Sequence, residues 1–387
     1  MLTMQNMSNT SKERAKFSFT AIDPYIETHI VSPTEKRIAG KDFVEWGTNN
    51  LYPEYLLDLY GNVATLKSII DGCVDYIAGD DVTILPLRAN MEGVMNAKGD
   101  TIMEQVRDIT KDYELYGGFA LQVVRGRDGL PSEIHYIDMR FIRMNKECNV
   151  FYYCEDWKRK GKKGVFVYPK FMPEIAEKWA SLTDEERNLH ASSILFVKDI
   201  RTQVYPSPKY AASVKSCEIE RCIDEFHLNA INNGFTGSYI INFNNGQPAT
   251  PEIQEEIEDN FNEKFSGHQN AGRIAFAWNE SRTTATTIEQ VPVQDFGEKY
   301  QSLEKASRQR IFTAFKANPN LFGIPTENLG FSSEEYESAF RLFNRTQIRP
   351  VQRKIADAYD KIYGKKGVLT IVPFSMDEDK ATDTIVK

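Results

Sequence analysis

Histidine and cysteine, the residues best able to do chemistry, are scattered through this sequence. The chain has 387 residues, with five histidines and five cysteines, and none forms a C-x-x-C or H-E-x-x-H pattern. Cys222 and His227 share one predicted helix but lack a second pair, so we interpret them as a packed core pair. A Walker loop, a G-x-G-x-x-G turn after a strand and a nucleophile elbow are also absent. The sequence predicts no catalytic residue, no metal site and no cofactor.

The charge of the chain limits how it could meet nucleic acid. A net charge of -8 argues against a surface that grips nucleic acid everywhere, because neutralising phosphates requires clustered lysine and arginine. One dense basic run exists, and it consists of Lys158, Arg159, Lys160, Lys162 and Lys163. This run could touch phosphate or an acidic partner surface, or it could be a solvated hairpin loop.

The composition is that of a soluble globular protein with more than one domain. Hydrophobic residues make up 41% of the chain and charged residues 26%. No apolar run approaches the roughly 20 residues that span a bilayer, and the polar start lacks the apolar core of a secretory signal. We therefore expect no membrane contact, a place inside a cell or a virion assembled there, and reduced cysteines.

A long helix, a compact insertion and a returning helix organise the middle of the chain. Ser207 and Pro208 predict that the first helix begins there and runs to Asn233. One face of this helix is apolar and includes Ile223 and Phe226. The other face is predicted to be acidic, and its residues are Glu218, Glu220, Asp224 and Glu225.

The insertion is predicted to fold as strand, helix, strand and strand. The strands are expected at residues 238–243, 273–278 and 286–291. Between the first two, Thr250 caps a helix whose apolar residues recur at four-residue steps. This predicted core stripe consists of Ile253, Ile257, Phe261 and Phe265.

The return helix is predicted to begin at Asp295 and carries a basic face. Its basic residues include Lys305, Arg308 and Arg310. They could complement the acidic helix within one subunit or between subunits. Alternatively, they form a solvated face near a helix C-terminus, where cations are favoured.

Shorter elements are predicted on either side of this hairpin. Asn50 and Pro53 are expected to start one short helix, and caps at Asn62 and Asp100 are expected to start two more. A fourth helix is expected over residues 170–189. Strands are expected at residues 82–85, 119–125, 134–137, 141–144, 150–154, 165–168, 194–197 and 368–374. A last long helix, from Ser332 to Gly364, should bend at Pro350.

Several short patterns occur in a distinctive order. They are WGTNNLYP at 46–53, VDYIAG at 74–79, YPSPKY at 205–210, NNGF at 232–235, SYIINF at 238–243, NAGR at 270–273 and NLFG at 320–323. In order and spacing, the chain resembles the portal proteins of tailed bacteriophages over residues 42–364.

This resemblance implies an α+β subunit made of named parts. These are an N-terminal arm (1–41), an α/β wing domain (42–205), a first stem helix (206–235), a small α/β clip (236–293), a second stem helix (294–317), a tunnel loop (318–331), a long kinked wing helix (332–364) and a short crown or tail (365–387). The two stem helices would form the projecting hairpin, with the clip as its insertion.

The resemblance also implies the function. A portal protein forms a homo-oligomeric ring, typically a dodecamer, at one capsid vertex of a virion assembled in the bacterial cytoplasm. It passes double-stranded DNA during packaging and ejection, without reading its sequence, and contacts the major capsid protein, the terminase and a head-tail adaptor. An acidic channel wall would avoid friction with phosphate, and the acidic stem face is the candidate.

The tunnel loop is implied to face the channel at its narrowest point. Its candidate channel residues are Asn318, Asn320, Glu327, Asn328 and Phe331. The alternative is a connector packed beneath the wing, with Leu321, Phe322, Ile324 and Leu329 buried there. Two other functions stay open: a different ring-forming connector or adaptor of the virion, which would usually be shorter, and an enzyme acting on nucleic acid.

Overall fold

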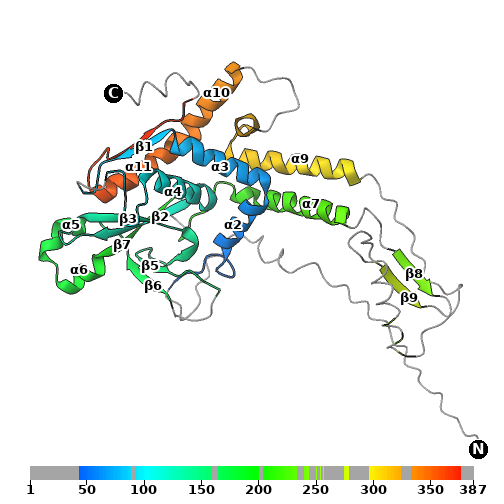
Figure 1. Cartoon of the computed structure of the whole chain (residues 1–387), viewed down its shortest axis with the longest axis horizontal. Helices are drawn as coiled ribbons and strands as arrows, with labels where there is room; N and C mark the ends of the chain where they lie inside the picture. Colours follow the sequence, from blue (N-terminus) through cyan, green and yellow to red (C-terminus); the bar gives the residue numbers. More distant parts are fainter. Residues whose placement is uncertain are drawn as a thin grey trace, which may run out of the picture.

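The computed structural model describes residues 43–88, 92–158, 164–199, 204–232, 239–243, 250, 253, 256, 274–278, 296–323 and 333–375. A globular part carries a long helical hairpin, α7 and α9, that extends away from it (Figure 1). The strands β8 and β9 lie beyond the far end of this hairpin (Figure 1). No helix in the described ranges combines the length and the apolar character needed to cross a membrane.

Three helices form the centre of the globular part. They are α2 (Tyr52–Asn62), α3 (Ala64–Ala78) and α4 (Ile102–Tyr116). The predicted cap at Asp100 is wrong by one residue, because Thr101 accepts from the Glu104 amide and Glu104 reaches back to Thr101. The predicted cap at Asn62 is also wrong, since its side chain donates to the Asp58 carbonyl oxygen at 2.8 Å.

The strands form small antiparallel sheets against these helices. One sheet has the order β3-β2-β7, with β2 (Gly118–Arg125) between β3 (Pro131–Ile137) and β7 (Ser192–Lys198). A second sheet consists of β4 (Ile142–Met144), β5 (Val150–Tyr153) and β6 (Phe166–Pro169). In a third sheet, β1 (Asp81–Ile84) pairs with β10 (Leu369–Val372), which is far away in the sequence. Each of these strands matches a predicted one to within a few residues.

The single helix predicted over residues 170–189 is wrong. The segment forms α5 (Glu174–Lys178), the 3-10 turn η2 (Trp179–Ser181) and α6 (Asp184–His190). Leu182 is extended, and Thr183 then caps α6 with Glu186 as its capping-box partner. The local capping residues therefore start a new helix where the apolar periodicity suggested continuity.

The first hairpin helix starts later than predicted. The 3-10 turn η3 (Ala211–Ser213) leads into α7 (Val214–Asn232), so Ser207 and Pro208 do not begin it. Gly117 explains why, because its φ is +86° and an added Cβ would lie 2.3 Å from the Ser207 carbonyl oxygen. Residue 207 therefore passes tightly against the end of α4, and the helix begins only beyond this contact.

The return helix and two strands of the insertion lie where they were predicted. The helix α9 (Phe296–Phe315) lies beside α7 (Figure 1). In the insertion, β8 (Tyr239–Phe243) pairs in parallel with β9 (Ile274–Trp278). The predicted strand at 286–291 lies outside the described residues.

The long C-terminal helix is interrupted at the predicted place. After the 3-10 turn η5 (Pro319–Phe322), α10 (Ser333–Phe343) continues through a π-helical segment, η6 (Asn344–Ile348), into α11 (Arg349–Tyr363). The Arg349 amide donates to the Asn344 carbonyl, five residues back. Pro350 follows at once and has no amide hydrogen to restore the α pattern.

Candidate functional site

The base of the α7/α9 hairpin is firmly seated on the globular part. Tyr210 is fully buried, its hydroxyl donates to the Leu115 carbonyl oxygen at 3.0 Å, and its ring stacks on Phe315 at 5.4 Å. The Ser213 hydroxyl donates to the Arg310 carbonyl oxygen at 3.0 Å. The two limbs are thus joined to each other and to the end of α4, which gives the projection a rigid base.

Glu220 does not belong to an exposed acidic face, so that prediction is wrong for this residue. It is 4% exposed, and its carboxylate accepts from the Thr65 amide at 3.1 Å and from the Thr65 hydroxyl at 2.8 Å. Thr65 lies in the first turn of α3, where amide groups lack helical partners. Glu220 therefore caps a helix of the globular part from the hairpin, the role that the sequence assigned to Asn62.

Glu218 is also buried, and the prediction is wrong here too. Its carboxylate pairs with Arg221 at 2.8 Å, one turn along the same helix. Burial and the adjacent Glu218 together raise the pKa of Tyr55 on α2. Only Asp224 and Glu225 remain exposed from the predicted acidic set. The acidic face is thus confined to the part of α7 beyond the globular contact.

The distal part of the hairpin exposes apolar side chains. The exposed fractions on α7 are 46% for Phe226, 59% for Leu228 and 60% for Ile231. Phe226 stacks on Tyr300 of α9 at 4.8 Å, so the limbs touch without covering these side chains. His227 is exposed as well, which makes the predicted packed pair with Cys222 wrong. We call Phe226, Leu228 and Ile231 the apolar hairpin patch.

The basic residues of α9 lie on its open side. Arg308 pairs with Glu304 of the same helix at 2.7 Å, and Lys305 and Arg310 are exposed. The hairpin therefore carries acid on one limb and base on the other, facing outward.

The start of the predicted tunnel loop packs against the globular part. Asn318 caps η5, and Leu321 is 5% exposed. The Tyr76 hydroxyl of α3 donates to the Leu321 carbonyl oxygen at 2.7 Å, and an added Cβ at Gly72 would come within 2.7 Å of the Phe322 ring. For residues 318–323 the packed-connector alternative is correct. Glu327, Asn328 and Phe331 lie outside the described residues.

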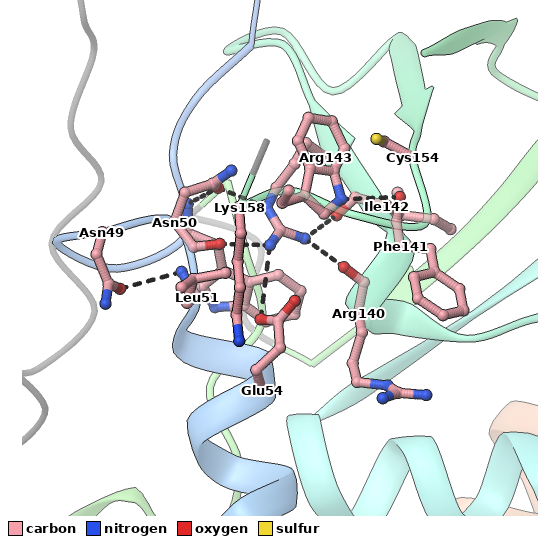
Figure 2. Close-up of polar contacts among 12 residues, drawn as sticks. Asn49, Asn50, Leu51, Glu54, Arg140, Phe141, Ile142, Arg143, Cys154 and Lys158 are labelled. Atoms are coloured by element: carbon pink, nitrogen blue, oxygen red, sulfur yellow. Dashed lines mark hydrogen bonds and ion pairs between the residues drawn. The ribbon is translucent and has the colours of Figure 1, made fainter. Parts of the chain in front are cut away.

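The WGTNNLYP segment is held by a buried arginine, Arg143 (Figure 2). Arg143 donates to the Asn50 side-chain oxygen and to the Asn50 carbonyl oxygen, both at 2.5 Å. It also donates to the carbonyl oxygens of Arg140 at 2.8 Å and Ile142 at 2.7 Å. Asn50 has a φ of +64°, a conformation that asparagine tolerates better than most residues. This cluster is structural, and the sequence analysis did not detect it.

Two other predicted sites are only partly within the described residues. Lys158 of the basic run is described, and its amide donates to Asp156 at 2.9 Å, but the other four residues of the run are not. Ile253 of the insertion stripe is 44% exposed, so its predicted burial is wrong, while Ile257, Phe261 and Phe265 are not described.

No cluster of three potential metal ligands occurs within the described part of the chain. All five cysteines are free thiols, as predicted, and the buried ones include Cys73 and Cys217. Burial raises the pKa of both thiols, so neither is activated as a nucleophile.

The sequence analysis also missed a regular row of arginines. Arg341, Arg345, Arg349 and Arg353 follow one another at four-residue steps along α10, η6 and α11, and all four are exposed. The spacing is visible in the sequence RLFNRTQIRPVQR, where apolar residues lie between the arginines. We call these four residues the arginine row.

Comparison with known proteins assigns the chain to a family. The model of the phage portal protein family matches residues 95–381, and the chain therefore belongs to that family, whose members are structural proteins and not enzymes. No curated protein matches the sequence.

Solved structures share the fold at low sequence identity. The neck of a native gene transfer agent particle, with C12 symmetry, matches with a TM-score of 0.51 and 16% identity, covering 86% of this chain and 87% of that one. The virion of the native particle matches with a TM-score of 0.50 and 16% identity, covering 86% of each chain. An HK97-family phage portal protein from Corynebacterium diphtheriae has a TM-score of 0.46 and 10% identity, covering 86% of this chain and 97% of that one.

Proposed function

We propose that this protein forms a ring at one vertex of a virion capsid and passes double-stranded DNA during packaging and ejection. The match of the phage portal family to residues 95–381 carries this proposal. The shared fold with a particle neck of C12 symmetry supports a ring of twelve subunits. The proposed partners are the major capsid protein, the terminase and a head-tail adaptor.

The parts of the subunit receive their roles from the same proposal. The globular part is the wing, α7 and α9 are the stem, and the insertion that holds β8 and β9 is the clip. The stem projects from the wing and ends near these strands (Figure 1). This arrangement suits a subunit whose stem lies beside the stems of its neighbours while its clip meets the packaging and tail components.

In the proposed ring, neighbouring subunits would contact each other through the exposed surface of the stem. The apolar hairpin patch loses contact with water if a neighbouring stem covers it, and each buried apolar side chain contributes about 1.5 to 3 kcal/mol. The acid on α7 and the base on α9 would meet if the α7 face of one subunit packs on the α9 face of the next. Such a contact is heterologous, and a heterologous contact that closes generates a ring.

The channel wall of this ring is proposed to be acidic, so that it repels the phosphates of DNA and does not bind them. Asp224 and Glu225 are the remaining candidates from the predicted acidic face, because they are exposed, and they would line the channel wherever the neighbouring stem leaves them uncovered. The tunnel is proposed to be formed by residues 324–331, which include Glu327, Asn328 and Phe331, and not by the packed start of the loop. Asn318 and Asn320 then support the loop from its base.

The ring contact is tested with Leu228→Asp combined with Ile231→Asp. Both side chains are about three-fifths exposed, so the subunit itself should tolerate the change, as circular dichroism would show. Rings should dissociate into monomers in native mass spectrometry. The matched control is Leu189→Asp on α6, which is equally exposed in the globular part and should leave rings intact. Intact rings in the double variant would place the subunit contact elsewhere.

A further inference from the structure

The arginine row is unusual because its charges are unpaired. In the described parts of the chain, no side chain of the arginine row makes a hydrogen bond or an ion pair. Glu337 and Asp357 lie four residues before and after the row and do not neutralise it. Four free cations are therefore placed in one row on a chain whose net charge is -8.

The π-helical segment keeps the row straight. In an α-helix, a step of four residues turns about 40° past a full turn, so a row at this spacing slowly rotates around the axis. A π turn holds more residues, and a four-residue step within it falls short of a full turn. Because η6 lies in the middle of the row, it counteracts the rotation that α10 and α11 produce.

The opposite face of the same helix fixes the row in position. Phe343, Ile348, Val351 and Ile355 are each at most 3% exposed and pack into the core. Buried side chains thus hold the helix on both sides of η6. The arginine row is therefore presented on a rigid support, and its charges cannot turn inward.

We propose that the arginine row binds the phosphate backbone of double-stranded DNA, an inference that rests on the proposed portal function. The row covers 12 residue steps, or about 18 Å, and its guanidinium groups recur about every 6 Å. Over that length, double-stranded DNA presents one negative charge per about 1.7 Å of axis. Guanidinium groups also bind phosphate oxygens in a bidentate manner, which ammonium groups cannot do.

A protein partner fits the row less well than DNA does. Protein interfaces have an apolar centre surrounded by polar residues, whereas the row contains only charged side chains. An apolar site does lie next to it, because Leu342 is 64% exposed and borders a cavity of about 390 Å³ with Lys316 and Thr346. A protein that docked there would use Leu342 first and the arginines second.

Binding through this row is compatible with DNA that moves. Each exposed charge pair is weak and is screened by salt, so no single contact stops the duplex. The row lies on the long helix, and the acidic residues Asp224 and Glu225 lie on the hairpin, a different part of the subunit (Figure 1). The row is therefore separate from the acidic residues that are proposed to line the channel.

The test compares three arginines with three lysines. Arg345→Gln, Arg349→Gln and Arg353→Gln are combined in one full-length variant, and the matched control combines Lys361→Gln, Lys365→Gln and Lys366→Gln, which are equally exposed. Binding of a labelled 30-base-pair duplex is measured by anisotropy between 50 and 300 mM salt, with ring formation checked by native mass spectrometry. This range changes the salt concentration about sixfold and the Debye length about 2.4-fold.

The arginine variant should form rings, bind the duplex at least about tenfold more weakly at low salt, and lose about 0.9 of salt slope per lost phosphate contact. The lysine control should bind as the unchanged protein does, and replacing the same arginines by lysine should retain most of the slope. Equal weakening in both variants would overturn the inference. So would unchanged DNA binding, with or without reduced incorporation into capsids. If the unchanged protein forms no rings, that result would instead contradict the proposed function.

Discussion

Arg143 joins two segments that are far apart in the sequence. It connects Asn50, at the start of α2, with the turn that contains Arg140 and Ile142 (Figure 2). Burial raises the pKa of the nearby Glu54, and the positive charge of Arg143 opposes this shift. An arginine at a strand position is usually exposed, so the sequence alone offered no reason to expect this cluster.

Replacing Arg143 by methionine should destabilise the protein strongly. The change keeps most of the side-chain volume but leaves the Asn50 and Ile142 oxygens buried without a donor, at a cost of about 3 to 5 kcal/mol in the free energy of unfolding. Arg107→Met is the control, because its ion pair with Asp75 is about half exposed and should contribute less than about 1 kcal/mol. Denaturant unfolding distinguishes the two, and equal losses would contradict a structural role for the cluster.

Asp112 should make the stability depend on pH. Burial, reinforced by Asp138, raises the pKa of Asp112 well above its usual range. The folded protein therefore binds this proton more tightly than the unfolded chain does. The resulting stability is complete below the unfolded pKa of about 3.9 and is lost as the pH rises through the folded pKa.

Asp112→Asn should remove that dependence, because the asparagine side chain does not titrate. Its oxygen can still accept the hydrogen bond that the Met139 amide donates to Asp112 at 3.1 Å in the unchanged protein. Relative to the unchanged protein, the variant should gain stability between pH 4 and neutrality. Unfolding by denaturant at several pH values measures this gain, and Asp224→Asn on the exposed part of α7 is the control. Parallel stability curves for the unchanged protein and Asp112→Asn would show that Asp112 does not titrate as argued.

At the scale of elements, the sequence periodicity correctly predicted those features that do not depend on contacts with distant segments. The helix predicted after Asp100 forms as α4, and its regular apolar stripe of Ile102, Val106 and Ile109 is buried. Helix starts were less predictable, since distant residues decide them. Glu220 caps α3 from more than 150 positions away, and the passage of residue 207 beside Gly117 delays α7.

Glu220→Ala tests whether the hairpin stabilises the globular part. The change leaves the amide and hydroxyl of Thr65 without their partner, which should lower the free energy of unfolding by about 1 to 3 kcal/mol. Asp224→Ala, on the exposed side of the same helix, should stay within about 0.5 kcal/mol of the unchanged protein. Hydrogen exchange at the first turn of α3 should rise only for Glu220→Ala. Unchanged exchange there would mean that another group caps the helix.

At the scale of the whole molecule, the hairpin is the part whose exposed surface is best suited to contact other subunits. Its base is secured by Tyr210 and Glu220, whereas its distal part exposes the apolar hairpin patch. Its two limbs also expose charges of opposite sign. The sequence predicted a projecting pair of helices around an insertion. It could not show that Glu218 and Glu220 face the globular part, because a helical repeat distinguishes faces without saying which face is covered.

Electron microscopy of the purified full-length protein, viewed along its symmetry axis, tests the central claim most directly. If the chain acts as a portal, most particles should be closed rings with a central opening, and native mass spectrometry should give one mass that is an integral multiple of the subunit. Rings should persist at moderate salt, because apolar contacts as well as charges hold them. Monomers alone across the whole salt range would contradict the account.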